Sequence, residues 1–205
     1  MKLYCHPGST TSRTVMFFAA EAGIPLELQI VDLFTGEQYQ PAYEAINPNH
    51  LVPVLEDDGF RLTESSSILK YLAEKTGSAA YPQDLKQRAR VNEAMDWVNT
   101  QLNRDYCYGF VYPQIFGFHK RRSDEAQKAQ LDWGRERAQG WLKVLDSHFL
   151  GRGKPYLCGD SLTLADSFAP PFVHAGELTG SALAAYPNVA AWLGRLKALP
   201  NWNRT

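Results

Sequence analysis

Two stretches of the chain have residue types and spacing that suit ligand binding. At Val52-Pro53, a proline at the start of an apolar run removes a backbone hydrogen-bond donor. Such a step, which also permits a cis peptide bond, can hold the N–H and C=O of Val52 free to face a ligand as a strand edge does. Residues 63–68, Thr-Glu-Ser-Ser-Ser-Ile, are typical of a helix start, where unpaired N–H groups bind anions. The simpler interpretation of this second stretch is a plain helix cap.

The composition argues against nucleic-acid and membrane functions. The chain has 205 residues, of which 44% are hydrophobic and 21% charged, and a net charge of -1. A protein this close to neutral has no general attraction for nucleic acid or acidic membranes. Its apolar runs are also far shorter than the roughly 20 residues of a membrane helix.

The cysteines and the first residues bear on the compartment. Cys5, Cys107 and Cys158 are odd in number and widely spaced, which gives neither a disulfide framework nor metal-ligand spacing. The chain does not begin with a signal-peptide core. We therefore expect a cytoplasmic protein with reduced thiols and no metal or other cofactor.

The first elements predict a βαβ unit. Residues 2–6 are typical of a strand, and the hydroxyl-rich run 9–12 supplies helix N-cap residues. An apolar stripe at helical spacing then continues until Gly23. Residues 26–31 alternate apolar and polar side chains, which indicates a second strand. A strand, a helix and a strand in so few residues should be parallel and right-handed.

A polar, turn-rich segment, 32–50, separates this unit from a predicted hairpin. The strands of the hairpin, 54–56 and 60–62, flank the turn sequence Asp57-Asp58-Gly59. A helix that opens at Ser65 and closes near Gly77 follows. The order βαβ-ββα is that of a thioredoxin-like domain.

The rest of the chain predicts helices only. Apolar side chains recur at helical spacing in residues 91–102, 131–149 and 189–199. Ser123 supplies the second of these with a cap, and Thr163 with Asp166 forms a capping box for a further helix. Pro170 and Pro171 should kink or end that helix. We expect residues 1–78 to form the thioredoxin-like domain, 79–84 a linker, and 85–205 an all-helical domain.

Four segments, in order, resemble those of the cytosolic glutathione S-transferases, most closely the serine-type delta and theta classes. Residues 3–9 are similar to the first strand and active-site turn of this family, and 47–55 to the loop before its cis-proline. Residues 64–72 are similar to the start of its third helix, and 159–166 to its capping-box signature. The resemblance covers nearly the whole chain.

The sequence also departs from the family pattern. Thr11-Ser12-Arg13 stands where the serine classes often carry Pro-Cys-Arg, and Ser66 stands where an arginine often follows the Glu-Ser pair. Gln38 replaces a histidine that can touch the glycine end of glutathione. Ser167 occupies a usually apolar position in the capping-box helix. The first three departures concern how glutathione is held, not the fold.

The resemblance implies that a hydroxyl activates the glutathione thiol. A free thiol has a pKa of about 8.5 and is mostly protonated at neutral pH, whereas the thiolate is the nucleophile. A hydroxyl at a helix N-terminus donates a hydrogen bond to the thiolate, in a field that favours negative charge. Ser9 matches the family's catalytic position, and its neighbours Thr10, Thr11 and Ser12 are alternatives. Any of the four could instead only cap the helix.

The resemblance also implies where the tripeptide binds. Glu64 and Ser65, with Ser66 beside them, would receive the γ-glutamyl end, and Val52 before Pro53 would pair with the cysteinyl backbone. His50 and Gln38 would reach the glycyl carboxylate. Glutathione is then a co-substrate, not a cofactor.

An aromatic-rich stretch supplies candidates for the electrophile pocket. We expect Tyr106, Tyr108, Tyr112 and Phe116 to line it, and Phe110 and Phe118 are nearby. Helical periodicity indicates that about half of these aromatics are core residues. Residues 119–122, His-Lys-Arg-Arg, are interpreted as a solvated loop.

The predicted function is conjugation of glutathione to a small hydrophobic electrophile, a detoxification chemistry, by a homodimer with the 91–102 helix as an interface candidate. A glutathione-dependent reductase or isomerase on the same fold is the alternative. It usually needs a cysteine at the turn, whereas Cys5 lies within the predicted strand. A non-catalytic binding module is a further alternative.

Overall fold

The computed structural model describes residues 1–151, 153–181 and 183–205. Its N-terminal part contains a four-stranded sheet in the order β2-β1-β3-β4. The strands are β1 (Lys2–Cys5), β2 (Glu27–Ile30), β3 (Val54–Asp57) and β4 (Phe60–Leu62). β1 pairs in parallel with β2 and antiparallel with β3, which pairs antiparallel with β4. The sheet therefore contains the predicted parallel βαβ pair and the predicted hairpin.

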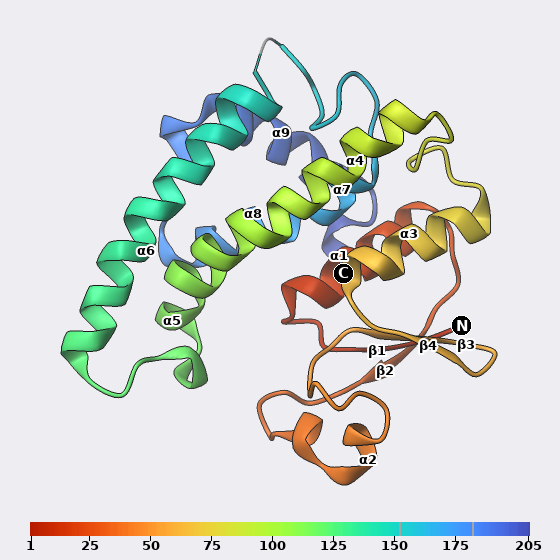
Figure 1. The fold of residues 1–205 in the computed structure, drawn as a ribbon, viewed down its shortest axis with the longest axis horizontal. Helices are drawn as coiled ribbons and strands as arrows, with labels where there is room; N and C mark the ends of the chain where they lie inside the picture. The colour runs from red at the N-terminus through yellow and green to blue at the C-terminus, as the bar shows by residue number, and fades with distance from the viewer. Residues whose placement is uncertain (152, 182) are drawn as a thin grey trace.

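Helices lie on both sides of this sheet. α1 (Thr10–Glu21) and α3 (Ser65–Thr76) pack together on one side, and the short α2 (Pro41–Glu44) lies on the other (Figure 1). Gly23 and Gly77, which follow α1 and α3, have φ values of 66° and 63° that a glycine adopts without strain. Both predicted helix stops are confirmed.

The polar segment before β3 contains more structure than the sequence indicated. It includes α2 and a 3-10 turn, η1 (Glu37–Tyr39), where only turns were expected. Each is about one helical turn long, so neither shows the repeating apolar spacing from which a helix is recognised.

The C-terminal part is helical. The first long helix is α4 (Leu85–Trp97), which continues with π-helical geometry as η2 (Val98–Val111) and then as α5 (Tyr112–Ile115). After the turn η3 (Gly117–His119), α6 (Asp124–Val144) continues as η4 (Leu145–Phe149). The remaining helices are α7 (Leu164–Phe168), α8 (Pro170–Ala175) and α9 (Pro187–Lys197), with 3-10 turns η5 (Gly176–Thr179), η6 (Leu183–Ala185) and η7 (Trp202–Arg204). None of the helices in the described ranges combines the length and hydropathy needed to cross a bilayer.

The fold class is the one predicted, a mixed sheet with helices followed by an all-helical part. The predicted cap at Ser123 is present, since its hydroxyl accepts a hydrogen bond from the N–H of Ala126 at 3.2 Å. The capping box of Thr163 and Asp166 is present, and α7 ends just before the proline pair that begins α8. The exact limits of the linker, 79–84, stay a prediction.

A glycine contact brings the two long helices together. A Cβ atom built on Gly134 of α6 would lie 2.3 Å from the carbonyl oxygen of Gly109 in η2, so no larger residue fits without a shift. The close approach fixes η2 against α6 along the length of their contact. It therefore also positions Tyr108 and Tyr112, whose side chains reach the candidate site.

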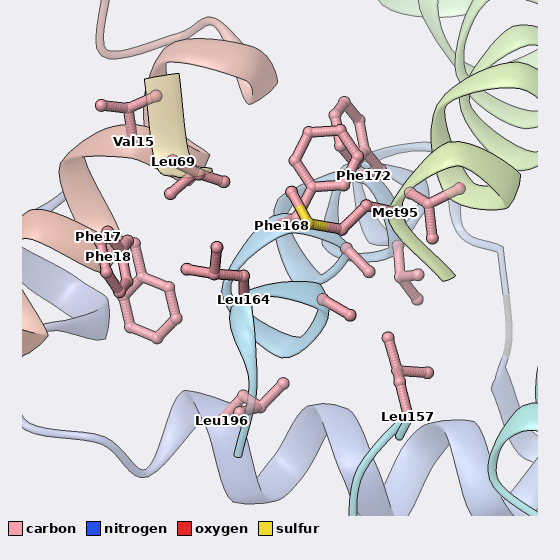
Figure 2. Packing of buried hydrophobic residues seen from close by; sticks show 14 of the residues in the cluster. Val15, Phe17, Phe18, Leu69, Met95, Leu157, Leu164, Phe168, Phe172 and Leu196 are labelled. Atoms are coloured by element: carbon pink, nitrogen blue, oxygen red, sulfur yellow. The ribbon is translucent and has the colours of Figure 1, made fainter. Parts of the chain in front are cut away.

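One hydrophobic core runs through both parts of the molecule. Phe17 and Phe18 of α1 and Leu69 of α3 face Leu164 and Phe168 of α7 (Figure 2). α7 contacts α1, α3 and α4, so it joins the sheet-side helices to the C-terminal ones. Full burial of one such side chain contributes roughly 1.5–3 kcal/mol. This shared core fixes the position of the two parts relative to each other, and the candidate site depends on that position.

A buried carboxylate ties η2 to α6. Asp105 is 0% exposed and accepts hydrogen bonds from Arg104 Nε at 2.7 Å, Arg137 Nε at 3.2 Å and Trp141 Nε1 at 2.7 Å. The hydrogen bond from Arg104, together with those from Trp141 and Arg137, lowers the pKa of Asp105 to about 2. The folded protein therefore favours the ionised form of Asp105 more strongly than the unfolded chain does.

This shift predicts an acid-dependent loss of stability. An unfolded aspartate has a pKa of about 3.9, so the contribution of Asp105 is complete above about pH 5 and is lost as the pH falls toward 2. A difference of nearly two pKa units corresponds to about 2–3 kcal/mol at neutral pH. Asp105→Asn should lose this amount at pH 7 and approach the wild-type stability at low pH, as measured by urea unfolding at several pH values.

Asp132 on α6 provides the matched control. It pairs with Lys128 and Arg135 on the helix surface, where ion pairs contribute about 0–1 kcal/mol. Asp132→Asn should therefore leave both the stability and its pH dependence nearly unchanged. A pH-independent loss in Asp105→Asn would mean that packing, not charge, is what Asp105 supplies.

Candidate active site

The turn after β1 places Ser9 at the N-terminus of α1. Ser9 is the N-cap residue, with φ -88° and ψ 120°, and its hydroxyl accepts a hydrogen bond from the N–H of Ser12 at 3.3 Å. His6 helps to shape the turn, because its Nδ1 accepts a hydrogen bond from the N–H of Gly8 at 3.0 Å. The unpaired N–H groups and the dipole of α1 therefore favour negative charge beside the Ser9 hydroxyl.

A chain of hydroxyls links Ser9 to Val52. The Ser9 and Thr11 hydroxyl oxygens are 2.9 Å apart, and the Thr11 hydroxyl donates to the carbonyl oxygen of Val52 at 3.0 Å. Because that carbonyl can only accept, the single proton of Thr11 is used there, and Ser9 must donate to Thr11. The sulfur atom of a ligand beside Ser9 would receive a hydrogen bond only after the Ser9 hydroxyl has rotated away from Thr11.

The neighbouring hydroxyls differ in what they can reach. Thr10 forms a hydrogen bond with the hydroxyl of Tyr112, across the boundary between the two parts of the molecule. Ser12 is completely buried, and its hydroxyl accepts from the N–H of His6 at 3.3 Å. The prediction of Ser12 as an alternative thiol partner is therefore corrected, because its side chain faces the interior and not the cavity.

The loop before β3 is held open by its own side chains. The peptide bond between Val52 and Pro53 is cis. Asn47 Nδ2 and the Tyr43 hydroxyl each donate to the carbonyl oxygen of Leu51 at 2.7 Å. These bonds fix the backbone on the N-terminal side of Val52, which lies at the edge of the cavity. Contrary to the expectation from the sequence, its carbonyl oxygen is not free, because it accepts the hydrogen bond from the Thr11 hydroxyl.

Gln38 and His50 lie together, although they are twelve positions apart in the sequence. The Nδ1 atom of His50 lies 2.9 Å from the carbonyl oxygen of Gln38, and the His50 backbone has φ 56°. Gln38 is 8% exposed, and its Nε2 lies 3.5 Å from the carbonyl oxygen of Leu33. Within the described residues its Oε1 has no partner, so this buried amide retains hydrogen-bonding capacity at the cavity wall.

Glu64 is the N-cap residue of α3, and Ser65 and Ser66 are the first two residues of that helix. Glu64 has φ 63° and ψ 108°, a backbone conformation that costs a non-glycine residue about 1–3 kcal/mol and often marks a functional site. None of these three side chains forms a hydrogen bond within the described parts of the chain. They do not line the cavity described below, so the structure places them outside it, at a helix N-terminus with free N–H groups.

A cavity of about 450 Å³ lies between the two parts of the molecule. One wall carries Ser9, Thr10, Thr11, Gln38, His50 and Val52, and the opposite wall carries Tyr108, Tyr112, Phe116, Phe118 and His119. The rings of Tyr108 and Tyr112 are edge to face, with centroids 5.0 Å apart. The arrangement combines hydroxyl donors at a helix N-terminus with an aromatic surface opposite them.

Tyr106 was expected in this pocket, and the structure corrects that prediction. It is 1% exposed and lies in the core beneath Gly176, where an added Cβ would meet the Tyr106 hydroxyl at 1.6 Å. Burial, the first of several causes, raises the pKa of this phenol far above its ordinary value. Tyr106 therefore packs η2 against the core and does not touch the cavity.

Sequence reasoning missed several residues of the cavity. His6, Phe34 and Tyr39 line it from the N-terminal part, and His119 lines it from the predicted solvated loop. Phe34 is 67% exposed, and an aromatic in a polar segment was a usable signal for it. Lys120 and Arg121, by contrast, are exposed as expected.

The cavity walls contain no lysine, arginine, aspartate or glutamate among the described residues. No group of three or more histidine, cysteine or acidic side chains in those same ranges is placed to hold a metal ion. A larger hollow of about 910 Å³ lies between the start of α4 and residues 158–163. It contains none of the predicted site residues, so the smaller cavity is the candidate site.

Known proteins share this fold and this division into two parts. Residues 8–75 match the family model for the glutathione S-transferase N-terminal domain, and residues 111–203 match that for its C-terminal domain. A curated relative, glutathione S-transferase theta-3 of Mus musculus, is 33% identical over 97% of this chain and 82% of its own length.

Solved structures give the same result. A delta-class glutathione transferase of Nilaparvata lugens is 33% identical, with a TM-score of 0.82 over 99% of this chain and 91% of that chain. A glutathione transferase homologue from Sulfitobacter, solved with bound glutathione, is 26% identical, with a TM-score of 0.85 over 99% and 95% of the two chains. The chain belongs to the glutathione S-transferase family, and it is a glutathione S-transferase enzyme.

Proposed function

We propose that this protein conjugates glutathione to a small hydrophobic electrophile and that Ser9 activates the thiol, as in the serine-type classes. The observation that supports this most directly is the hydroxyl chain from Ser9 through Thr11 to Val52, at the edge of a cavity with an aromatic opposite wall. Ser9 would donate a hydrogen bond to the thiolate, and the N-terminus of α1 would stabilise its charge. Thr10 is the remaining alternative among the neighbouring hydroxyls.

The tripeptide would extend from Ser9 along the loop that precedes β3. Its cysteinyl backbone would pair with Val52, ahead of Pro53, as an added strand does. Gln38 and His50 would contact the glycyl carboxylate, with the unpaired Gln38 amide atom as one contact. Glu64 would accept from the γ-glutamyl ammonium, and Ser65 with Ser66 would donate to its carboxylate. The bound glutathione of the Sulfitobacter relative is consistent with this proposal.

The electrophile would contact the opposite wall, formed by Tyr108, Tyr112 and Phe116. Conjugation of this kind is a detoxification reaction. We further propose a homodimer in the cytoplasm, on the basis of the family resemblance and of three cysteines that form no disulfide in this structure.

The reductase alternative has less support. It requires a reactive thiolate at the active-site turn, and the nearest cysteine is Cys5, at the end of β1. Cys5 is 0% exposed, and burial raises its pKa to about 11. A thiol with that pKa is protonated at neutral pH, so it is a poor nucleophile.

The γ-glutamyl contact provides a direct test. Glu64→Gln keeps the side-chain shape but removes the charge opposite the ammonium, and hydrogen bonds to charged groups contribute about 1.5–3 kcal/mol. We expect the Kd for glutathione, measured by calorimetry, to rise by at least about tenfold.

Glu136→Gln, at an exposed position of α6, is the control and should bind glutathione as the wild type does. If the wild type itself bound no glutathione, the proposed function would be wrong. If Glu64→Gln bound glutathione normally, the function would stand, and the γ-glutamyl end would need another partner.

A further inference from the structure

His119 is set in an aromatic cage at the cavity. It is the last residue of η3, half-buried, and its ring lines the cavity. The rings around it, with centroid separations of 4.8, 5.3, 5.4 and 6.2 Å, are those of Phe118, Tyr108, Tyr112 and Phe116. An imidazole with so many aromatic neighbours is a polar group within an apolar wall.

The imidazole keeps its hydrogen-bonding capacity. No side chain or backbone atom within the described ranges forms a hydrogen bond or an ion pair with its ring nitrogens. Burial lowers the pKa of His119, and the titratable groups that face it are the phenols of Tyr108 and Tyr112, whose own pKa values burial raises. At neutral pH the ring is therefore uncharged, with one N–H donor and one acceptor nitrogen.

The surroundings also exclude a charge partner for an acidic substrate. The cavity-lining residues include no lysine or arginine. Lys120 is exposed, and Arg121 forms hydrogen bonds with Gln127 through its backbone and with Gln130 through its guanidinium. The basic run beside His119 is therefore not part of the cavity wall, although it is adjacent in sequence.

We propose that His119 is the hydrogen-bond donor that selects the second substrate, and that this substrate is an uncharged, flat aromatic electrophile with an acceptor such as a nitro or carbonyl group. The proposal rests on the proposed conjugation and names the substrate class of that site. The aromatic ring packs on Phe116 and Tyr108, and the acceptor meets the N–H of His119.

The chemical step is the one that the proposed function requires. With a benzylic chloride, the glutathione thiolate forms a bond from sulfur to the benzylic carbon. The carbon–chlorine bond breaks, and chloride leaves with the electron pair. The thiol proton has already passed to solvent, so no oxidant or reductant is needed. His119 acts on the far end of the substrate and takes no proton.

A matched pair of substrates tests the donor role. Para-nitrobenzyl chloride and benzyl chloride differ only in the nitro acceptor. In His119→Phe, the ratio of kcat/KM for the nitro compound over benzyl chloride should fall by about five- to tenfold, the effect of losing one hydrogen bond. The change should lie mainly in KM, because the bond is present before the reaction as well as during it. His119→Gln retains an N–H donor and should restore most of the ratio.

A binding measurement makes the test independent of chemistry. Calorimetry with the unreactive products S-(para-nitrobenzyl)glutathione and S-benzylglutathione should show the same loss of nitro preference in His119→Phe. His148→Phe, on the exposed surface of η4, should keep the wild-type preference. An unchanged ratio in His119→Phe, or an equal loss in His119→Gln, would overturn the proposal. If the wild type bound neither product, the proposed function itself would fail.

Discussion

Ser9→Ala should lower the rate of glutathione conjugation by between about tenfold and about a hundredfold at neutral pH. The hydroxyl is the expected donor to the thiolate, and hydrogen bonds to charged groups contribute about 1.5–3 kcal/mol. Without this bond the thiol of bound glutathione should return toward its free pKa of about 8.5. The loss should therefore be largest at low pH and shrink as the pH rises and the thiol ionises unaided.

The pH–rate profile distinguishes this effect from a structural one. If Ser9 only positioned the turn, kcat/KM would fall by the same factor at every pH. Ultraviolet absorbance of the bound thiolate, titrated from acid to alkaline pH, would report the pKa directly. An increase in that pKa in Ser9→Ala is the specific expected result.

Ser9→Ala also removes the N-cap of α1, and the resulting loss of stability needs a separate control. Ser9 accepts from the N–H of Ser12 at 3.3 Å, and an N-cap substitution by alanine costs about 0.5–2 kcal/mol of stability. Ser123 caps α6 through the same kind of bond, far along the chain from the cavity-lining turn. Ser123→Ala should therefore lose comparable stability and keep the conjugation rate. A full rate in Ser9→Ala, with the loss appearing in Thr10→Val, would move the thiol contact to Thr10.

The sequence predicted those structural elements that a few neighbouring residues determine. The turn at Asp58-Gly59 has φ values of 48° and 84°, which Asp-Gly adopts readily, so the hairpin could be predicted from two residues. The capping box of Thr163 and Asp166 is equally local. The elements missed, η1 and α2, are too short for periodicity to reveal them.

The spacing of the aromatics indicates which of them share one face of a helix. Tyr108, Tyr112 and Phe116 are four residues apart, so on a helical segment they share one face. Tyr106 is two residues before Tyr108 and so lies about 200° around the helix. Its burial under Gly176 is consistent with this angle. The sequence could therefore have excluded Tyr106 from the pocket.

Other parts of the site depend on contacts that no local pattern contains. His119 lies at the cavity because η3 turns its ring toward Tyr108 and Tyr112, although its sequence neighbours are exposed. Phe34 reaches the same cavity from the N-terminal part and lies 6.3 Å, centroid to centroid, from Phe116. Such pairs follow from how the two parts of the fold meet, which depends on the core around α7.

Asp166, in that core, should be the position most sensitive to substitution for stability. Its carboxylate is 0% exposed and accepts from Leu157 N, Thr163 N and Trp192 Nε1, each at 2.9 Å, and from the Thr163 hydroxyl at 3.0 Å. It thereby joins the loop before α7, the start of α7 and α9. Asp166→Ala would leave these buried donors without an acceptor, and each such group costs about 1–3 kcal/mol.

We expect Asp166→Ala to lose about 4 kcal/mol of unfolding free energy, a size that few mechanisms reach, one of which is the breaking of a buried hydrogen-bond network. Thr163→Ala, which removes the cap hydroxyl but leaves the carboxylate with its other donors, should lose only about 1 kcal/mol. Asp160→Ala, an exposed position in the same loop, should change the unfolding free energy by less than about 0.5 kcal/mol. Urea unfolding of the three variants measures all of these values.

A loss in Asp166→Ala no larger than that in Thr163→Ala would show that Asp166 serves only as a helix cap. A large loss would show that the same residue also joins α9 and the loop before α7 to α7, the helix that contacts α1 and α3.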